Sequence, residues 1–285
     1  MPDVRFDVIC AGEAQWKVAM PTTRVSGMPL RPGGGAVDLA LALARERLHV
    51  GLATIMSDDD VGRRSLARLR ESRVDTGGVK LARPRGGLVL VDATGAANEL
   101  TRAPEESTTF EIPESWSSDL LLLSGLSPVT SRAAILCREA RRARRRGTLV
   151  AIDFNASLHA WAGRDPRTIL MVLREVDVAR CSVADLAVLG MEIAQVRASL
   201  RETAALVVNN AAGAAVATGP FGQVAITPKD ARPVLGSRGA GDAFTAAMCT
   251  ELLRPGDPGE SASASWHRAL HRGLMAAAAA TRVTA

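Results

Sequence analysis

Tyrosine is absent from this sequence of 285 residues, and aromatic residues together make up only 3% of it. Hydrophobic residues still reach 47%, so a large core is possible, and leucine, valine and alanine must fill it. No segment approaches the roughly 18–20 uninterrupted apolar residues that cross a bilayer. The amino terminus also lacks a basic stretch followed by a long apolar run, so no signal peptide is expected. These absences predict a cytoplasmic protein that does not enter a membrane.

Cysteine is sparse, and its spacing excludes a Cys-x-x-Cys metal or redox motif. We expect reduced thiols in the core of a cytosolic protein at Cys10, Cys137, Cys181 and Cys249. The net charge is only +5, with a pI of about 9.5. This mild basic excess suits an anionic ligand such as a nucleotide without demonstrating one. The arginine-rich run 138–146 has no aromatic or groove-reading partners nearby, so we interpret it as a solvated helix face and expect no nucleic-acid binding.

Short apolar segments alternate with segments of helical periodicity. Strands are predicted at 4–11, 50–56, 119–123, 149–153, 177–181 and 204–208, and helices at 36–47, 61–72, 130–146, from 242 and from about 263. This alternation predicts βαβ units and a mostly parallel sheet with helices on both faces. Ligands of such folds bind at the carboxyl ends of the strands.

Two stretches, 14–32 and 82–107, do not follow this alternation. Residues 87–92 and 96–110 read as a hairpin, and a second hairpin is predicted at 213–217 and 223–226. We expect 14–32 and 82–107 to pair as a small sheet that projects from the core as a lid. The whole chain, 1–285, is then one domain that carries this lid as insertions.

The segment Gly239-Ala240-Gly241-Asp242 precedes a helical pattern and is the most informative stretch of the chain. A glycine-containing loop that opens a helix presents free N–H groups and the positive end of the helix dipole, which suits a phosphate. Asp242 lies where a carboxylate can take a proton from a hydroxyl that attacks this phosphate. The alternative is a tight turn in which the aspartate only caps the helix.

Several motifs, in order along nearly the whole chain, resemble those of the ribokinase-like (PfkB) family of carbohydrate kinases. They are Gly12-Glu13, Gly33-Gly34, the segment 58–62 with Ser57 in place of a leading glycine, Asp153-Phe154-Asn155, and the segment 239–244. The resemblance implies a three-layer α/β/α core with a small β lid. It also implies transfer of the γ-phosphoryl group of ATP to a sugar hydroxymethyl, with Asp242 as the base and the amides of Gly239, Ala240 and Gly241 as the anion hole.

On the sugar side, the resemblance implies roles for Glu13, Gly33, Gly34 and Asp38. Asp38 stands where the family usually has asparagine, and Lys17 stands where an aspartate commonly binds sugar hydroxyls. This reversal of charge leads to the hypothesis that Lys17, together with Arg102 of the lid, faces a carboxylate or phosphate of the substrate. The alternative is that Lys17 is a solvated lid residue.

On the nucleotide side, the match is looser. The resemblance implies contacts to ATP from Asn209, Ala211, Gly213 and His271, while Arg238 either reaches a phosphate or faces solvent. Asp185 replaces the glutamate that helps to hold Mg²⁺ through water, with an ordinary helix-capping aspartate as the alternative. His267 and His271 are one helical turn apart, but no third metal ligand is evident, so we favour a surface pair.

Activation by K⁺ is left open, because residues 236–238 depart from the segment that forms the family's monovalent-cation site. A homodimer formed through the lid is also left open. The leading interpretation is a kinase of a sugar or of a sugar acid such as 2-keto-3-deoxygluconate, or of a ketohexose. The alternatives are a nucleoside kinase of the same fold and a non-catalytic sugar or nucleotide sensor.

Overall fold

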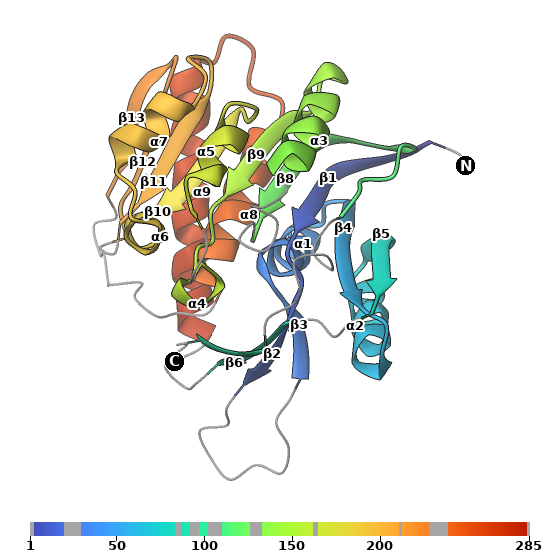
Figure 1. The fold of residues 1–285 in the computed structure, drawn as a ribbon. Coiled ribbons are helices and arrows are strands. Elements are labelled where there is room, and N and C mark those ends of the chain that lie inside the picture. The colour runs from blue at the N-terminus through green and yellow to red at the C-terminus, as the bar shows by residue number, and fades with distance from the viewer. Residues whose placement is uncertain are drawn as a thin grey trace.

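The computed structural model describes residues 3–19, 30–83, 87–91, 97–101, 110–125, 133–161, 165–210, 213–227 and 239–283. The described strands form one sheet of nine and a second sheet of four. Figure 1 shows the small sheet, with β2, β3 and β6 labelled, projecting from one end of the large one.

The large sheet has the strand order β13-β12-β11-β10-β9-β8-β1-β4-β5, and every pairing from β11 to β5 is parallel. The hairpin of β12 and β13 continues the sheet in antiparallel fashion. The strands are β1 (Val4–Gly12), β4 (Val50–Ser57), β5 (Val74–Ala82), β8 (Trp116–Ser124), β9 (Leu149–Asp153), β10 (Val178–Ser182), β11 (Ala205–Asn209), β12 (Ala215–Gly219) and β13 (Gly222–Ile226).

Helices cover both faces of this sheet, as Figure 1 shows. One face packs against α1 (Gly35–Arg45), α2 (Asp60–Glu71), α8 (Ala240–Leu252) and α9 (Ala262–Val283). The other packs against α3 (Ala133–Arg145), α4 (Leu158–Trp161), α5 (Thr168–Leu173), α6 (Val183–Leu189) and α7 (Ile193–Ser199). The predicted three-layer α/β/α architecture is confirmed.

The central strand β8 shows why the sequence pattern is a continuous apolar run. Leu121 and Leu123 pack on the α3 side of the sheet, whereas Leu120 and Leu122 pack on the α8 side. Because successive side chains of a strand point to opposite faces, a strand buried on both faces must be apolar at every position.

All four predicted core cysteines are buried free thiols.

The small sheet has the order β3-β2-β6-β7. Its strands are β2 (Gln15–Ala19), β3 (Leu30–Gly33), β6 (Gly87–Val91) and β7 (Ala97–Thr101). The pairs β2–β3 and β6–β7 are antiparallel, and β2–β6 is parallel. The expected small sheet is therefore present, while its action as a lid and the single-domain division remain predictions.

The edge strand β5 and the helices α4 to α7 did not follow from the sequence pattern. Within β5, Gly77 and Gly78 interrupt the apolar pattern. A Cβ on Gly78 would lie 2.9 Å from the Trp116 ring. The glycines are needed because the large indole of Trp116, which comes from β8, reaches past β1 and β4 and covers this part of the edge strand.

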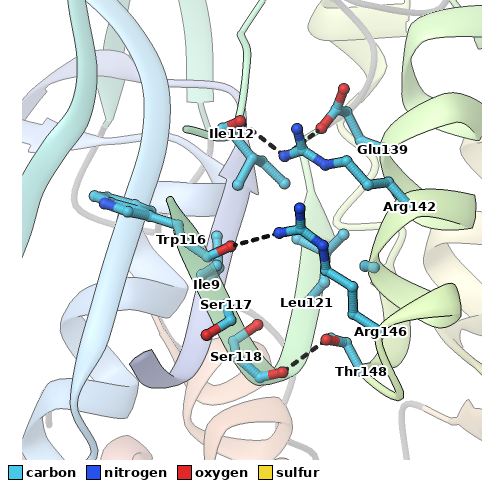
Figure 2. A pocket seen from close by; sticks show the side chains of 11 residues that line it. Ile9, Ile112, Trp116, Ser117, Ser118, Leu121, Glu139, Arg142, Arg146 and Thr148 are labelled. Atoms are coloured by element: carbon cyan, nitrogen blue, oxygen red, sulfur yellow. Dashed lines mark hydrogen bonds and ion pairs between the residues drawn. The ribbon is translucent and has the colours of Figure 1, made fainter. Parts of the chain in front are cut away.

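The arginine run 138–146 lies on α3 and the turn after it, at the amino ends of β8 and β9. Figure 2 shows Arg142 and Arg146 reaching into a hollow lined by α3 and β8, where they bind backbone oxygens of Ile112 and Trp116. Arg141 is ion-paired with Glu175. The solvated-face interpretation is thus incomplete, because part of the run satisfies carbonyl groups of the protein itself.

Within the described residues, no helix combines the length and the apolar character that crossing a bilayer demands.

Candidate active site

Close backbone contacts at the carboxyl ends of β1 and β8 build the floor of the candidate site. A Cβ on Gly12 would lie 1.8 Å from the Ser124 oxygen, so the two strand ends meet without room for a side chain. Gly34, with φ of 100°, makes the turn from β3 into α1, and a Cβ there would lie 2.6 Å from the Glu13 oxygen. Both the positive φ and the close approach of Glu13 require glycine at position 34, and the turn brings the start of α1 against Glu13.

Lys17 extends from β2 toward the first turn of α1. Its aliphatic stem crosses Gly33, where a Cβ would lie 2.6 Å from the lysine Cδ. Its Nζ lies 2.5 Å from Oδ2 of Asp38. Burial alone lowers the pKa of Lys17, but the charges of Asp38, Asp242 and Glu13 outweigh this and raise it, so the lysine is a fixed cation.

The amino terminus of α8 faces this charged group. Gly239 caps the helix in the left-handed conformation, with φ of 78°, and its carbonyl accepts the first helical hydrogen bond from the Ala243 amide at 2.8 Å. The amides of Ala240, Gly241 and Asp242 donate no hydrogen bond to the part of the chain that the structure describes. Within the described residues, these three N–H groups have no partner at the positive end of the helix dipole, and such an arrangement suits a phosphate.

Asp242 is partly buried in the first turn of α8. Burial raises the pKa of its carboxyl to about 7, and the negative charge of Asp38 adds to the rise, while Lys17 opposes it. The side chain does not cap its own helix through a hydrogen bond to any described residue. A carboxyl whose pKa lies near neutrality can accept a proton during catalysis and release it afterwards.

Arg180 was not anticipated from the sequence. It lies on β10 and its guanidinium bonds to Asp153 and Asn209 at 3.1 Å each, below the start of α8. Asp153 also accepts a hydrogen bond of 2.6 Å from Thr245. The only signal in the sequence was a charged residue inside a short apolar strand.

The structure describes three of the five residues predicted for the nucleotide, and their joint role stays a prediction. Asn209 is buried, and its Oδ1 is occupied by Arg180. Gly213 lies in a turn closed by a hydrogen bond of 3.1 Å from its amide to the Asn210 oxygen. His271 is exposed on α9, as is His267. Ala211 and Arg238 lie outside the described residues, and so does Arg102 on the sugar side.

Asp185 forms a capping box at the start of α6. Its Oδ2 accepts from the amide and hydroxyl of Ser182 at 2.6 Å each, and its Oδ1 accepts from the Ala156 amide at 2.7 Å. Among the described residues, no group of three or more potential ligands is placed to hold a metal ion. This donor set fits Mg²⁺ only in the way usual for nucleotide enzymes, in which phosphates and water supply most ligands and Asp185 is reached through water.

A model of the pfkB family of carbohydrate kinases matches residues 6–285. The chain belongs to this family. The resemblance found in the sequence and the prediction of a carbohydrate kinase are thereby confirmed, and Asp242 and the amides before it occupy the segment on which the resemblance rested most. No curated protein sequence matches this pfkB-family chain.

Solved structures share the fold of this pfkB-family protein. A PfkB protein from Polaromonas sp. JS666 is 23% identical with a TM-score of 0.73, covering 98% of this chain and 97% of that chain. Aminoimidazole riboside kinase from Salmonella enterica, solved with aminoimidazole riboside and an ATP analogue, is 20% identical with a TM-score of 0.76 and coverage of 96% and 93%. Fructokinase from Vibrio cholerae O395, solved with fructose, ADP and calcium, is 21% identical with a TM-score of 0.73 and coverage of 98% and 93%.

Proposed function

We propose that this pfkB-family protein uses ATP, with Mg²⁺, to phosphorylate a hydroxymethyl group of a sugar or sugar acid. The observation that carries the proposal is Asp242, a carboxyl with a pKa of about 7 beside three amides that bond to no described residue. A base and an anion-binding cradle side by side are the two parts that phosphoryl transfer asks of a protein.

In the proposed reaction, the γ-phosphoryl group of ATP rests on the amides of Ala240, Gly241 and Asp242, the first three of α8. Ala240 and Gly241 belong to the anion hole that the resemblance implied, and Gly239, its third member, is the cap before the helix. The hydroxyl oxygen of the acceptor forms a bond to the γ-phosphorus while the bond from that phosphorus to the bridging oxygen breaks. The bridging oxygen leaves with the electron pair as part of ADP, and the hydroxyl proton passes to Asp242. Mg²⁺, when bound, offsets the charge of the phosphates.

The contact between the small sheet and α1 supports the proposal that this sheet acts as a lid. Lys17 on β2 is joined to Asp38 on α1, so this sheet lies against the core next to Asp242. A cover at this place would keep water from competing with the acceptor hydroxyl for the phosphoryl group.

The choice of acceptor substrate is proposed to depend on the same two residues, Lys17 and Asp38. Lys17 and Asp38 replace the aspartate and asparagine expected from the family, and the charge of Lys17 is already balanced by its ion pair with Asp38. A substrate carboxylate would have to share Lys17 with Asp38. Both neutral ketohexoses and sugar acids such as 2-keto-3-deoxygluconate therefore belong in the substrate panel, together with nucleosides as the alternative class.

The remaining expectations stay part of this proposal. We propose that Glu13, Gly33 and Gly34 contact the sugar and that Asn209, Gly213 and His271 contact the nucleotide. Three further predictions are open to direct measurement. They are a cytoplasmic location, activation by K⁺ and dimerisation through the small sheet.

The test is ADP release in the presence of ATP and Mg²⁺ with a panel of neutral sugars, sugar acids and nucleosides. At least one acceptor should stimulate release, and Asp242→Asn should reduce kcat by about 10²–10⁴-fold while leaving nucleotide binding in place. Asp119→Asn is the matched control, because it removes one carboxylate from an exposed ion pair with Arg5. Binding without turnover by any acceptor would favour a sensor, and full turnover by Asp242→Asn would refute the base.

A further inference from the structure

Arg180 is a charged residue in the middle of a buried strand. Its neighbours on β10, Val178, Ala179 and Cys181, are all buried, and its own side chain is only 10% exposed. Placing a guanidinium in such surroundings carries a large desolvation penalty before its partners compensate. An apolar residue would fit the strand at less cost, so the arginine calls for a function.

The guanidinium is held in one orientation. Its Nε donates to Asn209 and its Nη1 to Asp153, at 3.1 Å each. Nη1 also lies 4.0 Å from an oxygen of Asp185, and Cζ lies 5.6 Å from the centre of the Phe244 ring. Nη2 makes no hydrogen bond to a residue that the structure describes, so a pre-oriented cation keeps donor capacity in reserve.

This unused side of the guanidinium faces the start of α8. A Cβ on Gly241 would lie 3.7 Å from both Nη1 and Nη2. The charge of Arg180 also lowers the pKa of Asp242, although burial and Asp38 outweigh it. The cation therefore lies beneath the same amides that form the proposed phosphate cradle, next to the proposed base.

Resting on the proposed function, we propose that Arg180 is a catalytic residue that donates from Nη2 to an oxygen of the transferred phosphoryl group. In the transition state, negative charge is spread over the three equatorial oxygens of this group while it builds up on the oxygen that leaves with ADP, so a fixed cationic donor there stabilises the transition state. Arg180 gives up no proton, since the acceptor proton goes to Asp242 and the electron pair leaves with ADP. Asp153, held by Thr245 at 2.6 Å, positions the guanidinium.

Arginine suits this place better than lysine would. The planar guanidinium binds Asn209 and Asp153 through two nitrogens and still presents a third. An ammonium on a flexible stem offers one nitrogen for all three directions. Arg180→Lys should therefore keep the charge and part of the function, whereas Arg180→Met should lose both.

The experiment compares the affinities of β,γ-imido-ATP and AMP by calorimetry, together with kcat, in the wild type, Arg180→Lys and Arg180→Met. Removing a charged donor to the γ-phosphate should weaken β,γ-imido-ATP by about 10- to 100-fold and leave AMP unchanged. The fall in kcat should be about 10²- to 10³-fold. Arg180→Lys should recover part of each loss.

The matched control is Arg201→Met. Arg201 is a partly buried arginine that binds Asp177 and the Val176 carbonyl at the opposite end of β10. Its loss should lower the melting temperature without changing the ratio of the two affinities. Because Arg180→Met leaves Asp153 buried and unpaired, the double variant Arg180→Met with Asp153→Asn, compared with Asp153→Asn alone, tests the same point in a charge-neutral core.

An unchanged affinity ratio in a folded Arg180→Met or double variant would overturn the role of Arg180, and wild-type turnover would still uphold the kinase function. A wild-type protein that neither binds β,γ-imido-ATP nor releases ADP with any acceptor would overturn both. The proposal is supported if Arg180→Met binds β,γ-imido-ATP more weakly relative to AMP while Arg201→Met keeps the wild-type ratio of these two affinities.

Discussion

Lys17 on the small sheet and Asp38 on α1 form an ion pair, with 2.5 Å between Nζ and Oδ2. Both residues act on Asp242, and their effects on its pKa are opposite: Asp38 raises it and Lys17 lowers it. The pair therefore joins the small sheet to the core and at the same time adjusts the proposed base.

Replacing Lys17 should shift the pH dependence of catalysis upward. In Lys17→Met a cation that lowers the pKa of Asp242 is lost, so this pKa rises above about 7. The base must be ionised to accept a proton, and the acid limb of kcat/KM should move to higher pH, lowering activity at pH 7 by about 3- to 10-fold. Lys80→Met, which removes an exposed lysine paired with Glu111, is the control. An acid limb that stays in place would contradict the coupling.

Replacing Asp38 should have the opposite effect on the same profile. In Asp38→Asn a negative charge next to Asp242 is removed, so the pKa of Asp242 falls and the acid limb moves to lower pH. The measurement is again kcat/KM against pH with the acceptor at low concentration. General damage to the site would lower activity in both variants, but it would not shift the acid limb of Lys17→Met to higher pH and that of Asp38→Asn to lower pH. Shifts in the same direction would show that the pair does not set the base.

The raised pKa of Asp242 should also lower the free energy of unfolding at neutral pH. The pKa of Asp242 in the folded protein is about 7, above the ordinary value of 3.8. The folded state therefore holds this proton more tightly than the unfolded state, and its contribution to stability is lost as pH rises from about 4 through 7. Asp242→Asn should raise the free energy of unfolding above pH 7 by about 2 kcal/mol, less than the full shift implies because the carboxyl is partly solvated.

This gain should become small as the pH falls to about 4, where the folded state holds the proton and the unfolded state holds it about half the time. Urea unfolding between pH 4 and 8 measures it. Asp119→Asn, at an exposed carboxylate, should show no comparable trend. A gain that does not depend on pH would mean that Asp242 ionises as readily in the folded protein as in the unfolded chain.

The sequence predicted those features that depend on local pattern. Strands such as β8 are apolar at every position because both faces are covered, and this pattern is visible in one segment. The loop before α8 was predicted because glycines and an aspartate lie next to each other at the start of a helix.

Features that depend on which strands become neighbours were not predictable. The Lys17–Asp38 pair joins positions separated by 21 residues through the register of β2 with β3 and the space left by Gly33. Arg180 meets Asp153 because β9 and β10 are adjacent and these two residues are register partners. Local periodicity does not predict the order of strands in a sheet, so the partners of a single charged residue in an apolar strand could not be predicted from the sequence.

The turn into α1 should tolerate no side chain at Gly34. Its φ is 100°, and a Cβ would lie 2.6 Å from the backbone oxygen of Glu13, so Gly34→Ala must move either β1 or α1. We expect a loss of about 3 kcal/mol or more in the free energy of unfolding, together with reduced kcat, because α1 carries Asp38. Gly190→Ala is the matched control, since Gly190 has φ of 61° and no neighbouring atom within 4 Å of a Cβ. It should cost only about 1 kcal/mol, the backbone strain alone, and leave kcat unchanged. Equal losses in urea unfolding would show that the contact with Glu13 relaxes without cost.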